Sequence, residues 1–153
     1  TTKGKKAKEK RKTNISWTTE QWLYDLVFSY MRSANTQAGW NFEIDAAEEM
    51  QIGKYSKGCF YDYHKDGDGI TTYDTPENNW TNNKTRKLSM SILLNEDYEG
   101  GNFKFYDDEE IALKGKAKGS ILVFPSYMQH CVKEVTKGNR YSLVVWFLGP
   151  KFK

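Results

Sequence analysis

The sequence has few cysteines and histidines, two of each among 153 residues, and it has no long hydrophobic run. Two cysteines, Cys59 and Cys131, are too few for a disulfide framework and show no CxxC spacing, so we expect buried thiols in a reducing compartment. No segment approaches the roughly 18 apolar residues of a membrane span, and the N-terminus lacks the apolar stretch of a signal peptide. These absences predict a cytoplasmic protein without a membrane-spanning segment.

The overall composition is that of a folded globular protein. Hydrophobic residues make up 38% of the chain, charged residues 28% and aromatic residues 15%, which excludes collagen-like, coiled-coil and wholly disordered chains. A chain of this length corresponds to about one domain and can bury a core without disulfide or metal staples. We therefore expect a single domain.

Positive charge is concentrated at the N-terminus. Residues 1–12 hold seven of the 23 basic residues against one acidic residue, Glu9, and without this segment the net charge of +3 becomes about −3. Such blocks of charge are usually solvated and flexible. We expect residues 1–15 to form a basic flexible tail and residues 16–153 to form the folded domain. The alternative is that the tail docks on an acidic surface such as nucleic acid.

One helix and a series of short strands are expected after the tail. Apolar residues from Trp22 to Met31 recur at helical spacing behind several possible N-caps, which predicts one amphipathic helix of about 15 residues. From Gly39 onward, short β-branched or aromatic segments alternate with Gly, Asn and Asp, as in antiparallel β folds. Strands are expected at 41–45, 49–56, 58–64, 86–95, 102–106, 120–124, 129–135 and 140–148. The fold class that follows is mainly β with an N-terminal helix, a jelly roll or double-stranded β-helix.

The polar segment 67–85 is longer than a turn between two strands requires. A long loop in a compact domain usually serves a site, so this segment is a candidate lid. Within it, Trp80 is either an anchor for the loop or an aromatic side chain that faces a substrate. The pair Gly100-Gly101 predicts a tight turn or bulge with unusual dihedral angles.

Each of the two histidines has an ordinary structural explanation. His64 precedes Asp66 by two residues, and the two-residue period of a strand would point both side chains to one face. His130 follows the apolar segment 121–124 and opens a new strand at a turn. Taken singly, a His-x-Asp pair is a weak signal in a chain with many acidic residues, and a lone histidine is more often a satisfied core residue.

Arg140 favours a functional interpretation of the two histidines over a structural one, because it begins an apolar strand. Alternation over 140–148 places Arg140, Ser142, Val144 and Trp146 on one face, and the other face is also largely apolar, which indicates a central strand between packed layers. A guanidinium group in the interior of a sheet is costly unless a carboxylate or phosphate pairs with it. Its partner is either a carboxylate of the protein or a ligand dianion held beside a metal ion.

The order of these residues resembles that of a known family. Two histidines and one carboxylate are the ligand set of non-haem Fe(II) oxygenases. The order His-x-Asp, then a distant His, then Arg ten residues later resembles the 2-oxoglutarate and Fe(II)-dependent dioxygenases, in particular the PKHD-type and prolyl 4-hydroxylase-like enzymes. The resemblance covers about residues 17–150, and its motif blocks follow in order at 55–58, 61–66, 86–95, 98–103, 119–126, 135–140 and 146–147.

The resemblance implies a catalytic centre and an activity. His64, Asp66 and His130 would bind Fe(II), and Arg140 would pair with the distal carboxylate of the cosubstrate 2-oxoglutarate. Oxidative decarboxylation of 2-oxoglutarate to succinate and CO2 would drive the hydroxylation of an unactivated C–H bond. By the same resemblance, ascorbate is a further expected cofactor.

The resemblance also implies the remaining walls of the cosubstrate pocket. Tyr55 would help to hold 2-oxoglutarate, and Trp146 would line the pocket near the second histidine. Some related prolyl hydroxylases carry a tyrosine where this chain has Leu93. Ser91, or alternatively Ser89, is a candidate to replace that hydroxyl contact.

The substrate that the resemblance implies is a prolyl residue of a protein or peptide. Relatives also oxidise lysyl residues, free amino acids or alkylated nucleobases, and a basic arm would suit a nucleic-acid substrate. A non-catalytic jelly-roll binding module is the alternative from another class, although such a module would not need the full set of site residues.

A calcium site is a further alternative. Residues 62–68 resemble an EF-hand loop, but Tyr73 stands where the twelfth position requires a bidentate glutamate. Starting the loop at Asp66 brings Glu77 to that position and puts Thr71 where the glycine belongs.

Overall fold

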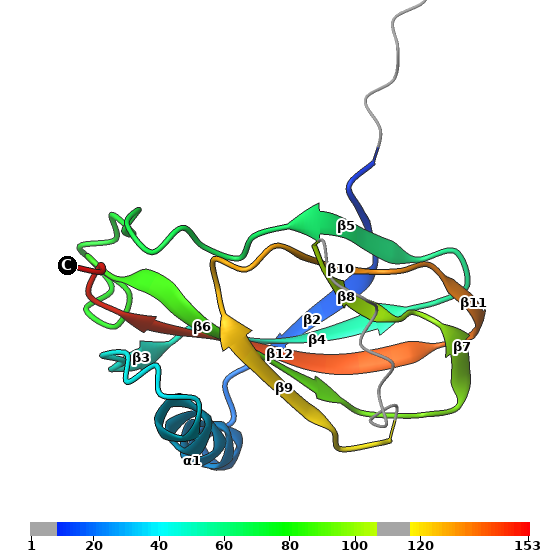
Figure 1. Ribbon diagram of the computed structural model, residues 1–153, viewed down its shortest axis with the longest axis horizontal. Helices are drawn as coiled ribbons and strands as arrows, with labels where there is room; N and C mark the ends of the chain where they lie inside the picture. Colours follow the sequence, from blue (N-terminus) through cyan, green and yellow to red (C-terminus); the bar gives the residue numbers. More distant parts are fainter. Residues whose placement is uncertain (1–8, 107–116) are drawn as a thin grey trace, which may run out of the picture.

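The structure is a computed structural model, and it describes residues 9–106 and 117–153. Its strands form two layers, with helix α1 (Gln21–Gln37) packed on the outer face of the larger sheet (Figure 1). The order in the larger sheet is β2 (Asn14–Thr18), β4 (Met50–Tyr55), β12 (Arg140–Gly149), β6 (Thr85–Leu93) and β9 (Ile121–Pro125), and β3 (Ala46–Ala47) also pairs with β12.

The smaller sheet faces the inner side of the larger one. Its order is β1 (Arg11–Lys12), β5 (Phe60–His64), β10 (His130–Val132) and β8 (Phe103–Phe105), and a separate pair joins β7 (Tyr98–Gly100) to β11 (Val135–Gly138). All the pairings between named strands are antiparallel. The predicted fold class, mainly β with one helix in a jelly roll, is confirmed.

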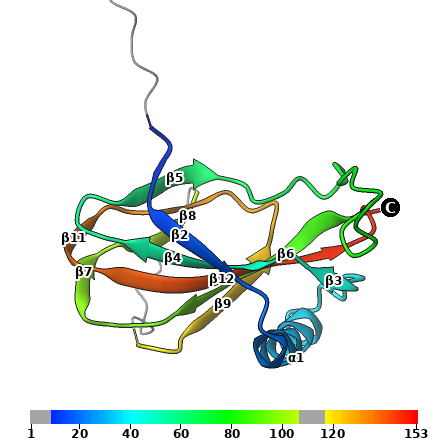
Figure 2. The same ribbon diagram turned by 180° about the vertical axis from the view of Figure 1, so that it is seen from behind.

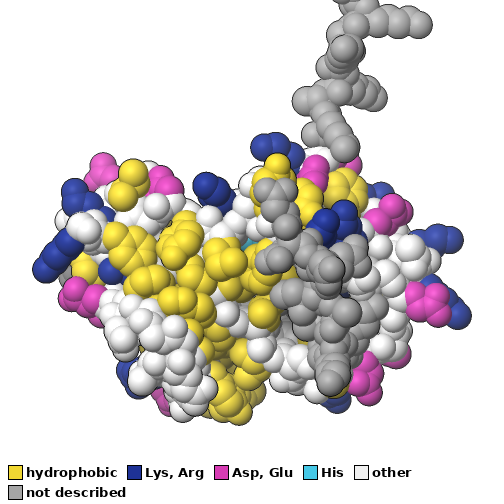
Figure 3. Space-filling model, viewed as in Figure 1, with side chains coloured by type: hydrophobic (Ala, Val, Ile, Leu, Met, Phe, Trp, Pro, Cys, Tyr) yellow, Lys and Arg dark blue, Asp and Glu magenta, His cyan; other side chains and the backbone are white. Residues whose placement is uncertain are grey.

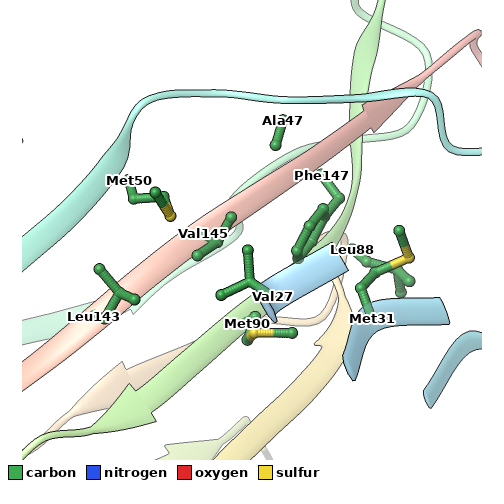
Figure 4. Close-up of a cluster of buried hydrophobic side chains, with 9 residues drawn as sticks. All are labelled: Val27, Met31, Ala47, Met50, Leu88, Met90, Leu143, Val145 and Phe147. Carbon is green, nitrogen blue, oxygen red and sulfur yellow. The ribbon is translucent and has the colours of Figure 1, made fainter. Parts of the chain in front are cut away.

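Strand β12 is the central strand that the sequence predicted. It lies between β4 and β6, and its odd-numbered residues from Leu143 to Phe147 point towards α1. Figure 4 shows how these side chains meet Val27 and Met31 of the helix. The opposite face of β12 is turned towards the smaller sheet, so one strand contributes both to the core and to the interior between the sheets.

The helix divides its apolar residues between two faces. Val27 and Met31 are fully buried, and the ring of Phe28 meets that of Phe147 edge to face with centroids 5.2 Å apart. Trp22, Leu26 and Tyr30 share the predicted apolar spacing but remain exposed. The periodicity therefore predicted the helix correctly and did not separate the buried stripe from the exposed one.

A second core fills the space between the sheets. It consists mainly of aromatic and β-branched side chains, and both cysteines are buried and unpaired, as predicted. Its buried members are Tyr55, Cys59, Phe103, Phe124, Val132 and Val135.

The predicted strand at 41–45 is wrong. Asn41 has a positive φ of 50°, and the backbone of Phe42 is satisfied by a side chain of α1. Asn35 accepts from the Phe42 N–H at 2.9 Å and donates to its carbonyl at 2.9 Å. Because these groups are already paired, the first strand after the helix begins later, at the two-residue strand β3.

The expected strand at 129–135 is also divided. Strand β10 pairs with β5 and β8, whereas β11 begins at Val135 and pairs with β7. The two halves therefore belong to different sheets, which a continuous apolar pattern does not reveal.

The structure differs from the expected domain boundary at residue 15. Arg11–Lys12 and Asn14–Thr18 are strands that pair with β5 and β4. Ile15 is 45% exposed and Trp17 is 51% exposed, so backbone pairing rather than burial holds this segment, and its hydrophobic pattern gave little signal. Residues 1–8, the rest of the expected tail, lie outside the described residues, so a role in nucleic-acid binding stays a prediction.

In the part of the chain that the structure describes, no helix is long and apolar enough to cross a membrane.

The packing of α1 on β12 predicts a large effect for a buried side chain and a small one for its exposed neighbour. We expect Met31→Ala to lower the free energy of unfolding by about 2–5 kcal/mol, because truncation leaves a cavity in the core. Tyr30→Ala, one residue away and exposed, should change it by less than about 0.5 kcal/mol. Urea unfolding followed by circular dichroism measures both, and equal losses would contradict the assigned orientation of the helix.

Candidate metal centre

Three side chains converge between the sheets at the ends of two paired strands. His64 closes β5, Asp66 follows two residues later, and His130 opens β10. Because β5 and β10 are antiparallel and in register here, His130 lies directly opposite His64. The ligand atoms of the three residues all lie within 4.8 Å of one another, and the described residues contain no second group of this kind.

The hydrogen bonds of the two imidazoles orient them for a metal ion. His64 Nδ1 lies 2.7 Å from the Asp62 carbonyl oxygen, and His130 Nδ1 lies 2.8 Å from that of Met128. A carbonyl oxygen only accepts, so each Nδ1 carries a proton and donates it. The lone pair of each Nε2 therefore faces the shared centre, as in metal sites whose histidines are oriented by backbone carbonyls.

Asp66 completes the centre with one oxygen and is held by the other. Its Oδ1 lies 3.3 Å from His64 Nε2 and 3.5 Å from His130 Nε2, while its Oδ2 accepts a 2.7 Å hydrogen bond from Ser89 Oγ. The Ser89 hydroxyl also lies 2.9 Å from that of Ser126. Burial alone would raise the pKa of Asp66, but the neighbouring imidazoles of His130 and His64 and the hydrogen bond from Ser89 outweigh it and hold the pKa well below its usual range. Asp66 is therefore ionised.

This arrangement fits a divalent metal ion. Three acceptor atoms face one another in a buried place, which is unfavourable unless a cation lies between them. Ligands at about 2.1 Å from one ion and at right angles lie roughly 3 Å apart, close to the separations seen here. Two imidazoles and one carboxylate on one side leave coordination positions open on the other, which is the facial arrangement of non-haem Fe(II) oxygenases.

Arg140 supplies a buried positive charge beside this centre. It is 5% exposed, and its Nη1 donates a hydrogen bond to Ser142 Oγ at 3.3 Å. Among the described residues no carboxylate forms an ion pair with it, and its Nε is buried without a hydrogen-bond partner. The alternative of a salt bridge within the protein is thus not found in this part of the chain, and the guanidinium group fits the carboxylate of a ligand.

Strand register and a glycine place Arg140. It lies directly opposite Tyr55 across β12 and β4, and its guanidinium carbon is 5.5 Å from the Tyr55 ring centroid. Gly101, with a positive φ of 63°, lies where a Cβ atom would come within 3.0 Å of the Arg140 Cδ. The predicted turn at Gly100-Gly101 therefore has the expected dihedral angles, and it also makes room for the arginine.

The structure brings all seven residues that the sequence singled out into one cavity. Its lining includes the three acceptor residues and the expected cosubstrate residues Arg140, Tyr55, Trp146 and Ser91. Their individual roles stay predictions, because proximity alone does not assign a contact. The lining of the cavity carries opposite electrostatic demands, since the triad requires a cation and Arg140 requires an anion.

Sequence reasoning missed a pair of charged residues that support the centre. Arg86 forms two hydrogen bonds with the Glu48 carboxylate, at 2.5 and 3.0 Å, and donates to the backbone carbonyl of Asp66 at 3.2 Å. Its guanidinium carbon also lies 4.0 Å from the Trp146 ring centroid. Arg86 therefore touches two walls of the site at once. Nothing in the local sequence distinguishes Glu48 from its acidic neighbour.

The segment 67–85 is tied to the turn before β4. Tyr73 donates to Glu48 Oε1 at 2.9 Å, Lys84 pairs with Asp45 at 3.0 Å, and the Trp80 indole donates to the Ala47 carbonyl. Trp80 thus anchors the loop, and its ring, 50% exposed, also lines a groove. The role of segment 67–85 as a lid stays a prediction.

The calcium alternative is not supported by the same segment. Asp68 accepts hydrogen bonds from Thr71 and from the backbone of Ile70, which lower its pKa to about 2. The carboxylate therefore closes a local turn instead of joining Asp66, which points to the histidines.

A groove of about 910 Å³ lies beside α1. Trp17 of β2 forms part of its wall, and the Trp17 ring lies 6.4 Å from that of Trp146 in the central cavity. Glu48 also lines the groove and connects it to Asp66 through Arg86. In the view of Figure 3, hydrophobic side chains surround a small visible part of a histidine. The centre therefore lies near surfaces that suit a large partner molecule.

Comparison with known proteins agrees with this geometry. Residues 50–148 match the model of the 2OG-Fe(II) oxygenase superfamily. A PKHD-type hydroxylase of Idiomarina loihiensis is 30% identical over 97 residues, which are 63% of this chain and 40% of that protein. The PKHD-type hydroxylase YbiX of Shigella sonnei is 28% identical over 97 residues, covering 62% of this chain and 40% of YbiX. The chain spans about two fifths of the length of these relatives.

Solved structures with this fold include prolyl hydroxylases. The viral collagen prolyl hydroxylase of Paramecium Bursaria Chlorella virus-1, in complex with 2OG, superposes with a TM-score of 0.69 at 18% identity over 92% of this chain and 81% of that one. A Pseudomonas putida prolyl-4-hydroxylase superposes with a TM-score of 0.64 at 24% identity, over 90% and 72% of the two chains. At these identities the likeness shows the fold.

The hydrogen bond from Ser89 to Asp66 predicts a specific effect on metal affinity. We expect Ser89→Ala to weaken Co(II) or Fe(II) binding by about 10–100-fold, because the bond orients a ligand. Ser91→Ala is the matched control, since Ser91 lines the same cavity on the same strand and should leave metal affinity within about twofold. Anaerobic titration calorimetry measures both, and equal losses would contradict the role assigned to Ser89.

Proposed function

This chain belongs to the 2OG-Fe(II) oxygenase superfamily, and from that membership we propose that it is an Fe(II)- and 2-oxoglutarate-dependent oxygenase that hydroxylates a prolyl residue of a protein or peptide. The observation that carries the proposal is one cavity with two unmet electrostatic demands. Its triad of acceptors requires a cation, and Arg140 requires an anion. A divalent iron ion supplies the cation, and a dicarboxylate supplies the anion.

Different residues of the chain bind the metal ion and the cosubstrate. Iron and 2-oxoglutarate, when bound, supply the oxidising power for hydroxylation of a C–H bond. His64, Asp66 and His130 hold the metal from one side and leave the other side open. Arg140 fits the distal carboxylate of 2-oxoglutarate, and Tyr55 lies beside it with a pKa that burial raises, so its phenol stays a neutral donor.

Aromatic walls keep the interior of the site dry. Phe103 stacks on the His130 imidazole with centroids 5.2 Å apart, and Phe124 meets the same ring edge to face at 4.7 Å. Both phenylalanines are buried. Exclusion of water strengthens the attraction between Arg140 and a carboxylate, because the local dielectric constant is low.

The surroundings of the centre favour a peptide as substrate. The groove beside α1 offers two half-exposed tryptophans, Trp17 and Trp80, to an extended chain, and the Trp17 ring lies 6.4 Å from that of Trp146 in the cavity. The named relatives are PKHD-type hydroxylases, and prolyl hydroxylases are among the structures with this fold. A prolyl hydroxylase of Trichoplax adhaerens, solved with a peptide fragment of hypoxia inducible factor, has the same fold at a TM-score of 0.65 and 20% identity. These likenesses support a prolyl side chain over the other substrates of such a site.

Removal of the Arg140 charge should separate cosubstrate binding from metal binding. We expect Arg140→Gln to need at least about tenfold more 2-oxoglutarate to reach half saturation, with Fe(II) affinity unchanged within about twofold. Anaerobic visible absorbance, following the band that appears only with both Fe(II) and 2-oxoglutarate, measures this. Lys137→Gln, at an exposed position on β11, is the control. Parallel loss of both affinities would indicate a folding defect and count against the assignment.

The substrate class is tested with a library of proline-containing peptides. We expect the protein with Fe(II), 2-oxoglutarate and ascorbate to add one oxygen atom to prolyl residues and to release succinate in equal amount. His64→Ala should give neither product, because the triad has no spare ligand. Peptide mass spectrometry localises the oxygen. Oxygen insertion only into lysyl residues, free amino acids or nucleobases would overturn the prolyl assignment and leave the oxygenase assignment in place.

A further inference from the structure

The N-terminal segment joins the two sheets beside the proposed cosubstrate site. Strand β1 pairs with β5 of the smaller sheet, with Arg11 directly opposite Tyr61, and β2 then pairs with β4 of the larger sheet. Figure 2 shows this segment in blue as it runs from one layer to the other. A stretch that composition assigns to a solvated tail is thus part of the cavity wall.

The Arg11 side chain points into the cavity. It lines the same cavity as Tyr55, His64 and Arg140. Its guanidinium carbon lies 4.4 Å from the Tyr61 ring centroid, a cation–π contact, and the Tyr61 ring in turn stacks on His64 at 3.5 Å. The arginine is therefore two ring contacts away from the triad.

Arg11 has no anionic partner in the part of the chain that the structure describes. Its Nε is buried without a hydrogen-bond partner there, and none of the ion pairs among the described residues involves it. Arg140 is in the same condition, and its guanidinium carbon lies 5.5 Å from the Tyr55 ring centroid. Both arginines act on that phenol, since each opposes the rise in its pKa that burial causes.

Two uncompensated guanidinium groups in one cavity are costly unless a ligand carries matching charge. Asp66 and the two histidines are already committed to a common centre. Among the described residues, Asp66 is the only carboxylate that lines the cavity, so this part of the protein leaves both guanidinium groups without a balancing charge there. A dicarboxylate that places one carboxylate away from the metal brings negative charge into the cavity that both arginines line.

We propose that Arg11 is a second cation of the 2-oxoglutarate pocket, acting with Arg140 on the distal carboxylate, and that the N-terminal segment thereby completes the site. This inference rests on the proposed function. Arg140 lies on the central strand of the fold, whereas Arg11 lies on a two-residue edge strand that the backbone of β5 holds in place. The affinity of the site for its cosubstrate then depends on a segment outside the 50–148 family match.

The test compares two ligands that differ in the distal charge. 2-Oxoglutarate and 2-oxopentanoate share the 2-oxo acid group that faces the metal, but only 2-oxoglutarate has a distal carboxylate. Titration calorimetry on the full chain loaded with Mn(II) gives both dissociation constants without turnover. For Arg11→Gln we expect about a tenfold weaker affinity for 2-oxoglutarate and less than about a twofold change for 2-oxopentanoate. Arg11→Lys should recover part of the preference, because it keeps the charge.

Matched variants give the experiment its controls. Lys12→Gln, on the next residue of the same strand, removes an exposed charge and should leave both affinities unchanged. Arg140→Gln should reduce the preference for 2-oxoglutarate as Arg11→Gln does. The melting temperature of each variant shows whether the strand still pairs.

The possible failures point to different conclusions. If the unaltered protein binds both ligands equally, the proposed function fails. If it prefers 2-oxoglutarate, and Arg140→Gln removes the preference while Arg11→Gln keeps it, the role of Arg11 is overturned and the proposed function stands. If Arg11→Gln weakens both ligands equally and lowers the melting temperature, Arg11 has only a structural role.

Discussion

Burial of charge without a matching charge from the protein is the constraint that shapes this molecule. Asp66 and two imidazole lone pairs face one another between the sheets, and Arg140 lies nearby with no carboxylate partner among the described residues. Such groups weaken a fold unless ligands neutralise them. The rest of the structure can be understood as the scaffold that holds these groups in place until ligands arrive.

Cross-strand pairing assembles the site. His64 lies opposite His130, Tyr55 lies opposite Arg140, and Tyr61 lies opposite Arg11. Residues that face each other in antiparallel strands have Cβ atoms about 4.5–5.5 Å apart, so register alone brings each pair into contact distance. A slip of one residue would turn every one of these side chains to the other face. For the pair of Tyr55 and Arg140, the apolar face of β12, packed on α1, prevents that slip because it would expose Val145 and Phe147.

The site and its surroundings are mechanically linked by one pair of charges. Glu48 receives two hydrogen bonds from Arg86 and one from Tyr73, so the loop 67–85, the turn before β4 and the backbone of Asp66 meet at one carboxylate. Burial and Glu48 act together on Tyr73, and its pKa rises to about 12. Its phenol therefore stays a donor over the physiological range. A bound molecule that displaced the loop from Glu48 would also disturb the support of Asp66.

The fold class, the helix, the alternation of β12 and seven of the residues that line the cavity could be predicted from the sequence. These follow from short-range regularities, namely hydrophobic period, turn residues and the spacing of two histidines, one aspartate and one arginine, and the family resemblance rests on the same residues. The parts that depend on partners distant in the chain became visible only in the folded structure. Asn35 took the backbone of Phe42 out of the sheet, Glu48 reached Arg86, and the N-terminal residues left the expected tail to pair with β4 and β5. Backbone pairing and single long-range hydrogen bonds leave no periodic signature, which is why the pattern of residues did not reveal them.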